Sequence, residues 1–202
     1  MKRVGVFGGT FDPIHIGHLI VAECVREACR LDQVLFVPAG VPPHKNAAGI
    51  TSARHRYMMT VLATLTHPHF EVSRVDIDRE GPCYTVDTLA ILRNVLAPAE
   101  LYFLMGSDSL ADLPTWHEPE RLLRENRLIV AGRPGWSIEQ ARAALGPLYE
   151  RHRDRIEHVT VPGIDVSSRA IRARLAAGKS ARYQLPDLVL RYIEAHGLYR
   201  TG

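Results

Sequence analysis

Short apolar runs alternate with longer segments of mixed polarity along this 202-residue chain. Apolar runs predict strands at residues 4–7, 33–38, 101–105 and 128–131, and the more mixed segments 70–75 and 156–161 complete a predicted set of six. The longer mixed segments predict helices. The first helix begins after residue 18, and the others cover residues 51–66, 85–96, 138–155 (interrupted near Gly146 and Pro147), 167–177 and 186–197. Unbroken apolar runs are typical of parallel strands covered on both faces. The pattern therefore predicts an α/β fold with a doubly wound, mainly parallel, Rossmann-like sheet.

The length and composition predict one domain. Hydrophobic residues make up 46% of the chain, which is enough to bury a substantial core. Neither an internal repeat nor a linker-like stretch divides the sequence. We expect a single domain over residues 1–202, in which residues 165–202 form a small C-terminal helical subregion.

The segment from Gly8 to His18 joins the first predicted strand to the first predicted helix and reads Gly-Gly-Thr-Phe-Asp-Pro-Ile-His-Ile-Gly-His. Backbone N–H groups and the positive end of a helix dipole converge at such a turn. Glycines let the backbone approach an anion, and Thr10 adds a hydroxyl donor. The segment predicts a phosphate site with the imidazoles of His15 and His18 aimed into it. Asp12 is expected to orient the turn through a local Asx-type bond.

Further polar candidates follow other predicted strands. In α/β sheets, ligands bind outside the carboxyl ends of the strands. The candidates at these ends include His44, Lys45, Gly106, Asp108, Arg133, Ser168 and Arg172. Because the carboxyl ends of parallel strands share one edge, we expect these residues to converge on one site.

Charge and cysteine content narrow the class of protein. The formal net charge is +3 and the charges are interspersed, which gives no support for a nucleic-acid partner. No apolar stretch is long enough to span a bilayer, and the start does not read as a signal peptide. The three cysteines form no metal-ligand spacing and fit reduced thiols. The sequence thus predicts a cytoplasmic protein with no membrane partner and no protein-held metal.

The cationic and donor groups at the predicted site suit a polyphosphate. These groups are His15, His18, Lys45, Arg133 and Arg172. Nucleotidyl transfer needs positioning and charge stabilisation more than covalent help from the protein. No serine nucleophile with its own base is evident, so we expect direct in-line attack without an enzyme intermediate. Mg²⁺ is expected to bridge phosphate oxygens, held mainly by substrate and water.

The segment from Gly8 to His18 resembles the signature of the bacterial nicotinate mononucleotide adenylyltransferase family, within the nucleotidyltransferases that share His-x-Gly-His. The resemblance extends along nearly the whole chain, with later motifs in family order. These motifs lie at residues 42–45, 84–89, 106–108, 114–116, 133–135, 166–172, 192–193 and 198–199. The resemblance implies transfer of AMP from ATP to nicotinate mononucleotide, which forms nicotinate adenine dinucleotide and pyrophosphate in NAD biosynthesis.

The resemblance also implies a role for each matching residue. His15, His18 and Arg172 would stabilise charge on the phosphates. The remaining ATP contacts would come from Gly8, Gly9, Thr10, Phe11, Gly106, Asp108 and Ser168. The mononucleotide would be bound by His44, Lys45, Thr85, Trp116 and Arg133, with Trp116 and Thr85 at the nicotinate ring and carboxylate.

Two positions depart from the family pattern. The last motif commonly reads Ser-Ser-Ser or Ser-Ser-Thr, whereas Arg169 stands at its third position here, so a hydroxyl role is not carried over to it. His117 follows the tryptophan, and its part in ring binding stays open. The sequence is compatible with a homo-oligomer but does not determine one.

Three alternative functions share parts of the first motif. An enzyme that adenylylates phosphopantetheine and a cytidylyltransferase for an alcohol phosphate both carry His-x-Gly-His. The double glycine before Thr10, Pro-Pro-His-Lys at residues 42–45 and Pro-Thr-Trp at residues 114–116 weigh against both. A nucleotide-sensing or synthetase-like binding module is the third alternative. The Lys-Met-Ser-Lys-Ser loop that accompanies His-x-Gly-His in class I synthetases is missing from the sequence.

Overall fold

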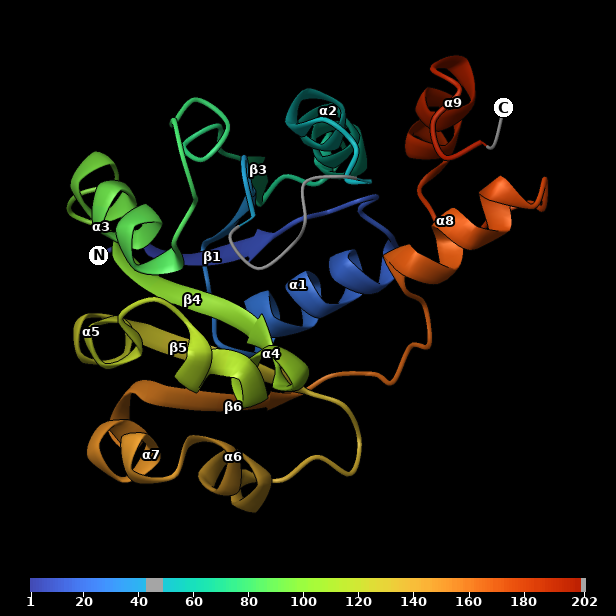
Figure 1. Cartoon of the computed structure of the whole chain (residues 1–202). Helices are drawn as coiled ribbons and strands as arrows, with labels where there is room; N and C mark the ends of the chain where they lie inside the picture. The colour runs from blue at the N-terminus through green and yellow to red at the C-terminus, as the bar shows by residue number, and fades with distance from the viewer. Residues whose placement is uncertain (43–48, 201–202) are drawn as a thin grey trace.

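A parallel sheet forms the centre of the molecule. The computed structural model describes residues 1–42 and 49–200, and within them six strands form one sheet in the order β3-β2-β1-β4-β5-β6 (Figure 1). Every neighbouring pair is parallel. The strands are β1 (Arg3–Gly9), β2 (Gln33–Pro38), β3 (Phe70–Val72), β4 (Glu100–Gly106), β5 (Arg127–Gly132) and β6 (Ile156–Thr160). The predicted α/β class with a parallel sheet is confirmed.

Helices cover both faces of this sheet. One core layer contains residues of α1 (Ile16–Ala28), α2 (Ala53–Thr64), α8 (Ser168–Ala176) and α9 (Asp187–Ala195). The other contains residues of α3 (Thr85–Val95), α4 (Ser107–Asp112), α5 (Pro119–Glu125), α6 (Ile138–Leu145) and α7 (Pro147–His152). Side chains alternate between the layers along β1, where Val4 and Val6 enter the second and Phe7 enters the first. Double coverage explains why the strands read as unbroken apolar runs.

The helical pattern differs from the prediction in two regions. The segment predicted at residues 138–155 divides into α6, α7 and a 3₁₀ turn at Arg153–Arg155. Gly146 has a φ of 52° and Pro147 starts the next helix, so the chain turns where these two residues stand. Helices α4 and α5, and the 3₁₀ turn Leu113–Thr115 between them, were not predicted. Each is seven residues or shorter, which is too short to show a helical period.

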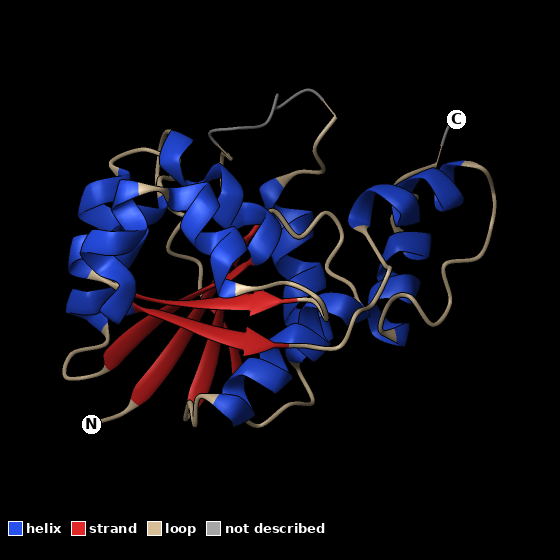
Figure 2. Cartoon of the chain, turned by 90° about the horizontal axis from the view of Figure 1, so that it is seen from below, coloured by secondary structure: helices blue, strands red, loops and turns tan. Residues whose placement is uncertain are grey.

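The C-terminal helices lie to one side of the sheet (Figures 1 and 2). Helix α9 packs against α2, and the chain end then returns toward the loop after β1. The division into one domain with a helical subregion at residues 165–202 stays a prediction. Within the described ranges, every helix is too short or too polar to cross a bilayer.

Candidate active site

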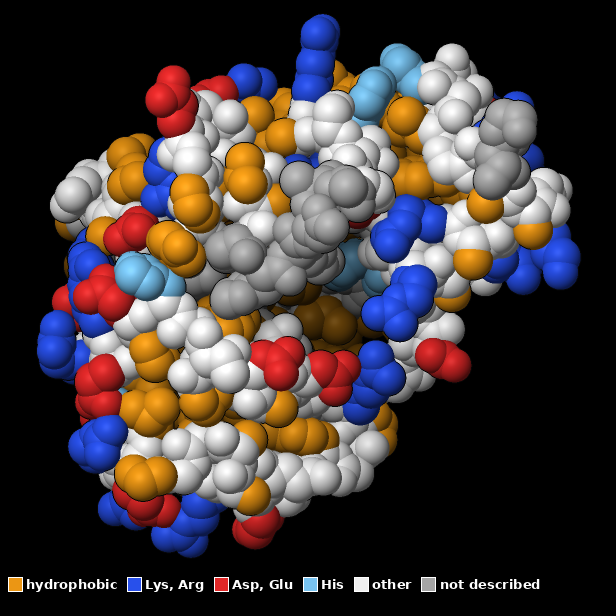
Figure 3. Space-filling model, in the orientation of Figure 1, with side chains coloured by type: hydrophobic (Ala, Val, Ile, Leu, Met, Phe, Trp, Pro, Cys, Tyr) orange, Lys and Arg blue, Asp and Glu red, His pale blue; other side chains and the backbone are white. Residues whose placement is uncertain are grey.

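A cleft of about 740 Å³ opens at the carboxyl edge of the sheet. Figure 3 shows the molecule hollowed there, with Lys and Arg side chains along one rim. The cleft brings together twelve of the predicted residues: Gly8, Gly9, Thr10, Phe11, His15, His18, Thr85, Gly106, Asp108, Trp116, Arg133 and Ser168. Arg172 lines a smaller neighbouring cavity of about 150 Å³, which shares Thr10, His18 and Ser168 with the cleft. His44 and Lys45 lie outside the described residues.

The phosphate turn, defined here as residues 8–13, has a shape that depends on glycine. Phe11 adopts a left-handed conformation with a φ of 49° and folds its ring back over the end of β1. A Cβ atom at Gly9 would lie only 2.8 Å from that ring. The double glycine therefore allows the turn to close as well as an anion to approach the backbone.

The two histidines form a stacked pair at the start of α1. Their ring centroids are 3.7 Å apart, and the backbone N–H of His15 donates to Nδ1 of His18 at 3.2 Å. A neutral His18 therefore carries its ring proton on Nε2. A Cβ at Gly17 would lie 3.1 Å from the His15 ring, so glycine leaves the room that this ring occupies. The spacing of His-x-Gly-His therefore places the two imidazole rings face to face at the start of α1.

Burial changes the chemistry of His15. The residue is 6% exposed, and desolvation lowers its pKa to about 4, so the free site holds a neutral imidazole at pH 7. Its Nδ1 atom is buried and has no hydrogen-bond partner among the described residues. A polar atom left in this state favours a ligand that bonds to it. A phosphate oxygen nearby would also shift the equilibrium back toward the protonated ring.

The outer side of the phosphate turn is held by Arg56 of α2. This arginine is 1% exposed, and its guanidinium donates to three backbone carbonyls. Nη1 bonds Thr10 at 2.7 Å, Nη2 bonds Gly40 at 2.9 Å and Nε bonds Thr51 at 2.8 Å. One side chain therefore joins the loops after β1 and β2. The role of Arg56 was not predicted from the sequence. Every residue has a backbone carbonyl, so the sequence does not show which carbonyls an arginine binds.

Helix α8 also reaches the turn. Ser168 Oγ donates to the Pro13 carbonyl at 2.9 Å, and Nη1 of Arg172 donates to the Asp12 carbonyl at 2.7 Å. Both residues were expected to contact ATP phosphates, and that role stays a prediction. The expected local Asx bond of Asp12 is wrong. Its carboxylate accepts instead from the Thr51 N–H at 3.4 Å and from the hydroxyl of Tyr199 at 2.6 Å.

A second part of the cleft lining, called the aromatic wall below, carries aromatic rings. Trp116 follows the turn Leu113–Thr115, and its half-buried ring stands edge-on to Phe103 with centroids 6.2 Å apart. His117 stacks on Tyr84 at 4.1 Å. Thr85, which follows Tyr84 in the sequence, begins α3. The segment around Trp116 thus meets the start of α3 at the cleft, and Tyr84 is a lining residue that sequence analysis did not assign.

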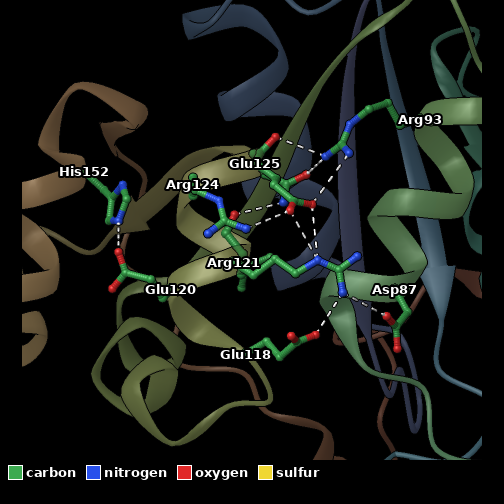
Figure 4. A network of polar contacts seen from close by, with 10 residues as sticks. Asp87, Arg93, Glu118, Glu120, Arg121, Arg124, Glu125 and His152 are labelled. Atoms are coloured by element: carbon green, nitrogen blue, oxygen red, sulfur yellow. Dashed lines mark hydrogen bonds and ion pairs between the residues drawn. The ribbon is translucent and has the colours of Figure 1, made fainter.

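Exposed ion pairs stand behind this wall (Figure 4). Arg121 of α5 contacts Glu118 at 2.8 Å, Asp87 of α3 at 3.8 Å and Glu125 at 3.3 Å. Glu118 has a φ of 49° and directly follows the segment that carries Trp116 and His117. The ion-pair network therefore connects α3 and α5, the two helices that flank the aromatic wall.

Residues 151–155 read Arg-His-Arg-Asp-Arg, the densest basic stretch of the chain, and part of this stretch is buried. His152 is buried and bonds Oε1 of Glu120 at 2.7 Å, while Arg151 pairs with the other oxygen of that carboxylate. These contacts hold the pKa of Glu120 low, at about 2. They fasten α7 to α5, away from the cleft.

Sequence comparison identifies the family. The sequence model of the cytidylyltransferase-like family matches residues 6–174. A probable nicotinate-nucleotide adenylyltransferase of Thermomicrobium roseum is 52% identical to this chain, and the match covers all of this chain and 93% of the relative. A protein of the same name from Thermus thermophilus is 46% identical, with coverage of 98% and 100%.

Structural comparison supports the fold. A Plasmodium falciparum nicotinic acid mononucleotide adenylyltransferase complexed with NaAD aligns with a TM-score of 0.79 at 21% identity, covering 98% of each chain. The same protein complexed with APC gives a TM-score of 0.77 with equal coverage. At this identity the structural likeness concerns the fold, while the sequence relatives carry the assignment. This chain therefore belongs to the cytidylyltransferase-like family and, within it, to the nicotinate-nucleotide adenylyltransferases.

Proposed function

We propose that this protein transfers AMP from ATP to nicotinate mononucleotide and releases pyrophosphate and nicotinate adenine dinucleotide. The observation that carries the proposal is the pairing of two unlike walls in one cleft. A turn rich in backbone donors, with a histidine pair beside it, and a half-buried tryptophan line the same cleft at the carboxyl edge of the sheet. The names of the close relatives point to the same reaction.

The proposed reaction is an in-line attack by the phosphate of the mononucleotide on the α-phosphorus of ATP. The new P–O bond forms as the bond to the departing pyrophosphate breaks, so the leaving group gains negative charge. Donors fixed in advance where charge develops lower the barrier, because they need no reorganisation. Thr10, His15 and His18 are such donors in this proposal, and Arg172 adds a positive charge from the adjoining cavity. No covalent enzyme intermediate is required.

Mg²⁺ fits this arrangement as an ion carried by the substrate. Among residues 1–42 and 49–200, no group of three His, Cys, Asp or Glu side chains could hold a metal. The cleft does present oxygen ligands, from Thr10, Asp108 and Ser168, and Mg²⁺ prefers oxygen. We propose that phosphate oxygens and water supply most of its coordination. The ion would neutralise charge on the phosphates.

The acceptor subsite is proposed to lie against the aromatic wall. Trp116 would stack on the pyridine ring, and Thr85 would lie beside it at the start of α3. Arg133 directly follows β5 and is exposed at the cleft, where its guanidinium can pair with the phosphate of the mononucleotide. His44 and Lys45 are proposed to complete this subsite. Gly106 and Asp108, at the end of β4, are proposed for the adenosine side.

A turnover assay with ATP, Mg²⁺ and a panel of acceptors tests the proposal. The panel contains nicotinate mononucleotide, its amide, phosphopantetheine and an alcohol phosphate, and products are separated by chromatography. We expect rapid formation of the dinucleotide and pyrophosphate with nicotinate mononucleotide. Turnover of phosphopantetheine without turnover of the mononucleotide would show that the proposal is wrong.

The proposal also covers the cellular compartment and the oligomeric state. Cys24, Cys29 and Cys83 are free thiols, and burial raises the pKa of Cys29 to about 11, which suits an inert thiol in the reducing cytoplasm. A homo-oligomer is compatible with the chain, and light scattering of the purified protein would establish its oligomeric state.

A further inference from the structure

A tyrosine at the end of the chain reaches the phosphate turn. The hydroxyl of Tyr199 donates to Oδ1 of Asp12 at 2.6 Å, across 187 residues of sequence. This distance is typical of an O–H donor on a carboxylate, which is stronger than a bond between neutral groups. Asp12 is 4% exposed, so water offers little replacement for this bond.

The C-terminal backbone is folded so that it delivers this hydroxyl. Helix α9 ends with Gly197 at a φ of 60°, and the Leu198 N–H bonds back to the Ile193 carbonyl while the Gly197 N–H bonds to Glu194. This pair of bonds is a Schellman ending, which turns the chain sharply away from the helix axis. Leu198 and Tyr199 then pack against the core layer that contains α2.

The hydroxyl stays a donor under all working conditions. Burial raises the pKa of Tyr199 far above its usual range, and the neighbouring Asp12 carboxylate raises it further. Proton exchange with Asp12 is therefore disfavoured, and the bond keeps one direction.

Asp12 transmits this contact to the turn. Its second oxygen accepts from the Thr51 N–H, and its carbonyl accepts from Arg172. Phe11, the preceding residue, is in the left-handed region, which a phenylalanine adopts only when its surroundings hold it there. The Tyr199 hydroxyl thus anchors the residue next to the strained position, while Tyr199 itself lines neither the cleft nor the adjoining cavity.

We propose that Tyr199 is a positioning residue for nucleotidyl transfer, which acts through Asp12 to keep the phosphate turn in the shape that receives the phosphates of ATP. The inference rests on the proposed function and deepens it. Tyr199 itself touches no substrate. Its effect should therefore fall on ATP and spare the acceptor, which binds at the other wall.

The test compares Tyr199→Phe with Tyr192→Phe. Tyr192 is a matched control, because its hydroxyl also forms a partly buried hydrogen bond, at 2.9 Å to Nδ1 of His55, but between α9 and α2 and not with the phosphate turn. We expect Tyr199→Phe to lower kcat/KM for ATP about tenfold, the size of one lost bond to a charged group. The KM for nicotinate mononucleotide should stay within about twofold of wild type in both variants.

A double variant with Asp12→Asn tests whether Tyr199 acts on the phosphate turn through the Asp12 carboxylate. If Tyr199 acts through the Asp12 carboxylate, adding Tyr199→Phe to Asp12→Asn lowers kcat/KM by less than about twofold further. A further tenfold loss in that background would overturn the route. Equal values of kcat/KM for Tyr199→Phe and Tyr192→Phe, per folded molecule by circular dichroism, would overturn the proposal itself.

Calorimetric binding of an unreactive ATP analogue separates this inference from the proposed function. The measurement needs no acceptor, so it can be made even if nicotinate mononucleotide is not turned over. Weaker binding by Tyr199→Phe than by Tyr192→Phe would support the positioning role when the acceptor assignment fails. Equal binding together with equal turnover would contradict it.

Discussion

The two walls of the cleft are fixed by different kinds of contact. On the phosphate side, Arg56, Tyr199 and α8 bind the turn through partly buried hydrogen bonds, three of them to backbone carbonyls. On the aromatic side, ring stacking and the ion pairs of Arg121 hold the segment around Trp116. The Arg121 side chain is 34% exposed and that of Glu118 is 44% exposed, so water competes for these charges.

This difference matches what each wall has to do. Stabilising a developing charge needs donors fixed to within a fraction of an ångström, and a small displacement costs a large factor in rate. Accepting a ring needs a flat apolar surface, which tolerates small shifts. Buried bonds to carbonyls are expensive to break, whereas exposed ion pairs exchange easily with water. Substitutions on each wall test whether the two differ in this way.

The largest expected effect comes from removing the arginine that joins two loops behind the turn. Arg56→Met keeps much of the side-chain volume but leaves three carbonyls of half-buried residues without their donor, and it removes a guanidinium that is itself buried. We expect a loss of about 3–5 kcal/mol in the free energy of unfolding, measured with urea. The matched control is Arg121→Met on the aromatic side, for which the midpoint should stay close to wild type. Equal midpoints for the two variants would remove the contrast between the walls.

The next prediction concerns the charge-stabilising pair. His18→Ala should lower kcat about 10²–10³-fold, the range for losing one preorganised donor in the transition state. His18→Asn is a useful companion, since its side-chain oxygen can replace Nδ1 as acceptor for the His15 N–H and so preserve the helix start. Both variants should lose activity. Near wild-type kcat in the asparagine variant would assign His18 to the helix start alone.

The fold was predictable to the extent that its elements are long and periodic. The central strands β1, β2, β4 and β5 are recognisable because burial on both faces leaves their middles apolar, whereas the edge strands β3 and β6 carry polar residues. Helices α4 and α5 were missed, although Leu110 and Leu122 bury fully in the core. Six or seven residues do not complete two helical turns, and Pro114 lies between the two helices while Pro119 begins α5, so tertiary packing decides their structure.

The site was predictable where a motif places residues next to each other, and less so elsewhere. The turn and the histidine pair lie within eleven consecutive residues, and the structure brings them together at one edge. The supports behind the turn come from Arg56 and Tyr199, which are 46 and 187 residues from their partners. Backbone carbonyls carry no sequence identity, so the sequence gives no signal for Arg56, and the motif at residues 198–199 does not show that Tyr199 binds Asp12.

The pH dependence of the free energy of unfolding tests the burial of His15 beside the phosphate turn. The pKa of His15 is lowered to about 4 in the folded protein, whereas an unfolded histidine titrates near 6.5. Between these values the unfolded chain binds the extra proton, so stability is complete above about pH 6.5 and falls as the pH drops toward 4. The expected loss is about 2–3 kcal/mol relative to His15→Gln, which does not titrate. Parallel curves of unfolding free energy against pH would contradict the burial of this ring.

On the aromatic side, substitution of Trp116 is expected to change the KM for nicotinate mononucleotide and not the KM for ATP. Trp116→Ala should raise the KM for nicotinate mononucleotide roughly 5- to 150-fold, as a lost stack of about 1–3 kcal/mol implies. Trp116→Phe keeps a flat ring and should recover most of this loss, while the KM for ATP moves little in both. The acid should be preferred over the amide, because the N–H groups at the start of α3, beside Thr85, pair better with a carboxylate. Equal increases for ATP and mononucleotide would indicate a folding defect instead of a lost stack.

The smallest expected effect is that of the ion pairs behind the tryptophan. Arg121→Met removes the contacts to Glu118, Asp87 and Glu125 together, yet all four side chains are partly in water, which already weakens the attraction. We expect the KM for nicotinate mononucleotide to rise less than about threefold, and the difference from wild type to shrink at about 1 M salt, where screening removes the remaining attraction. KM titrations at low and high salt measure both effects. If Arg121→Met matched the effect of Trp116→Ala, the aromatic wall would depend on its ion pairs as strongly as the phosphate turn depends on its buried bonds, and the two walls would be of one kind.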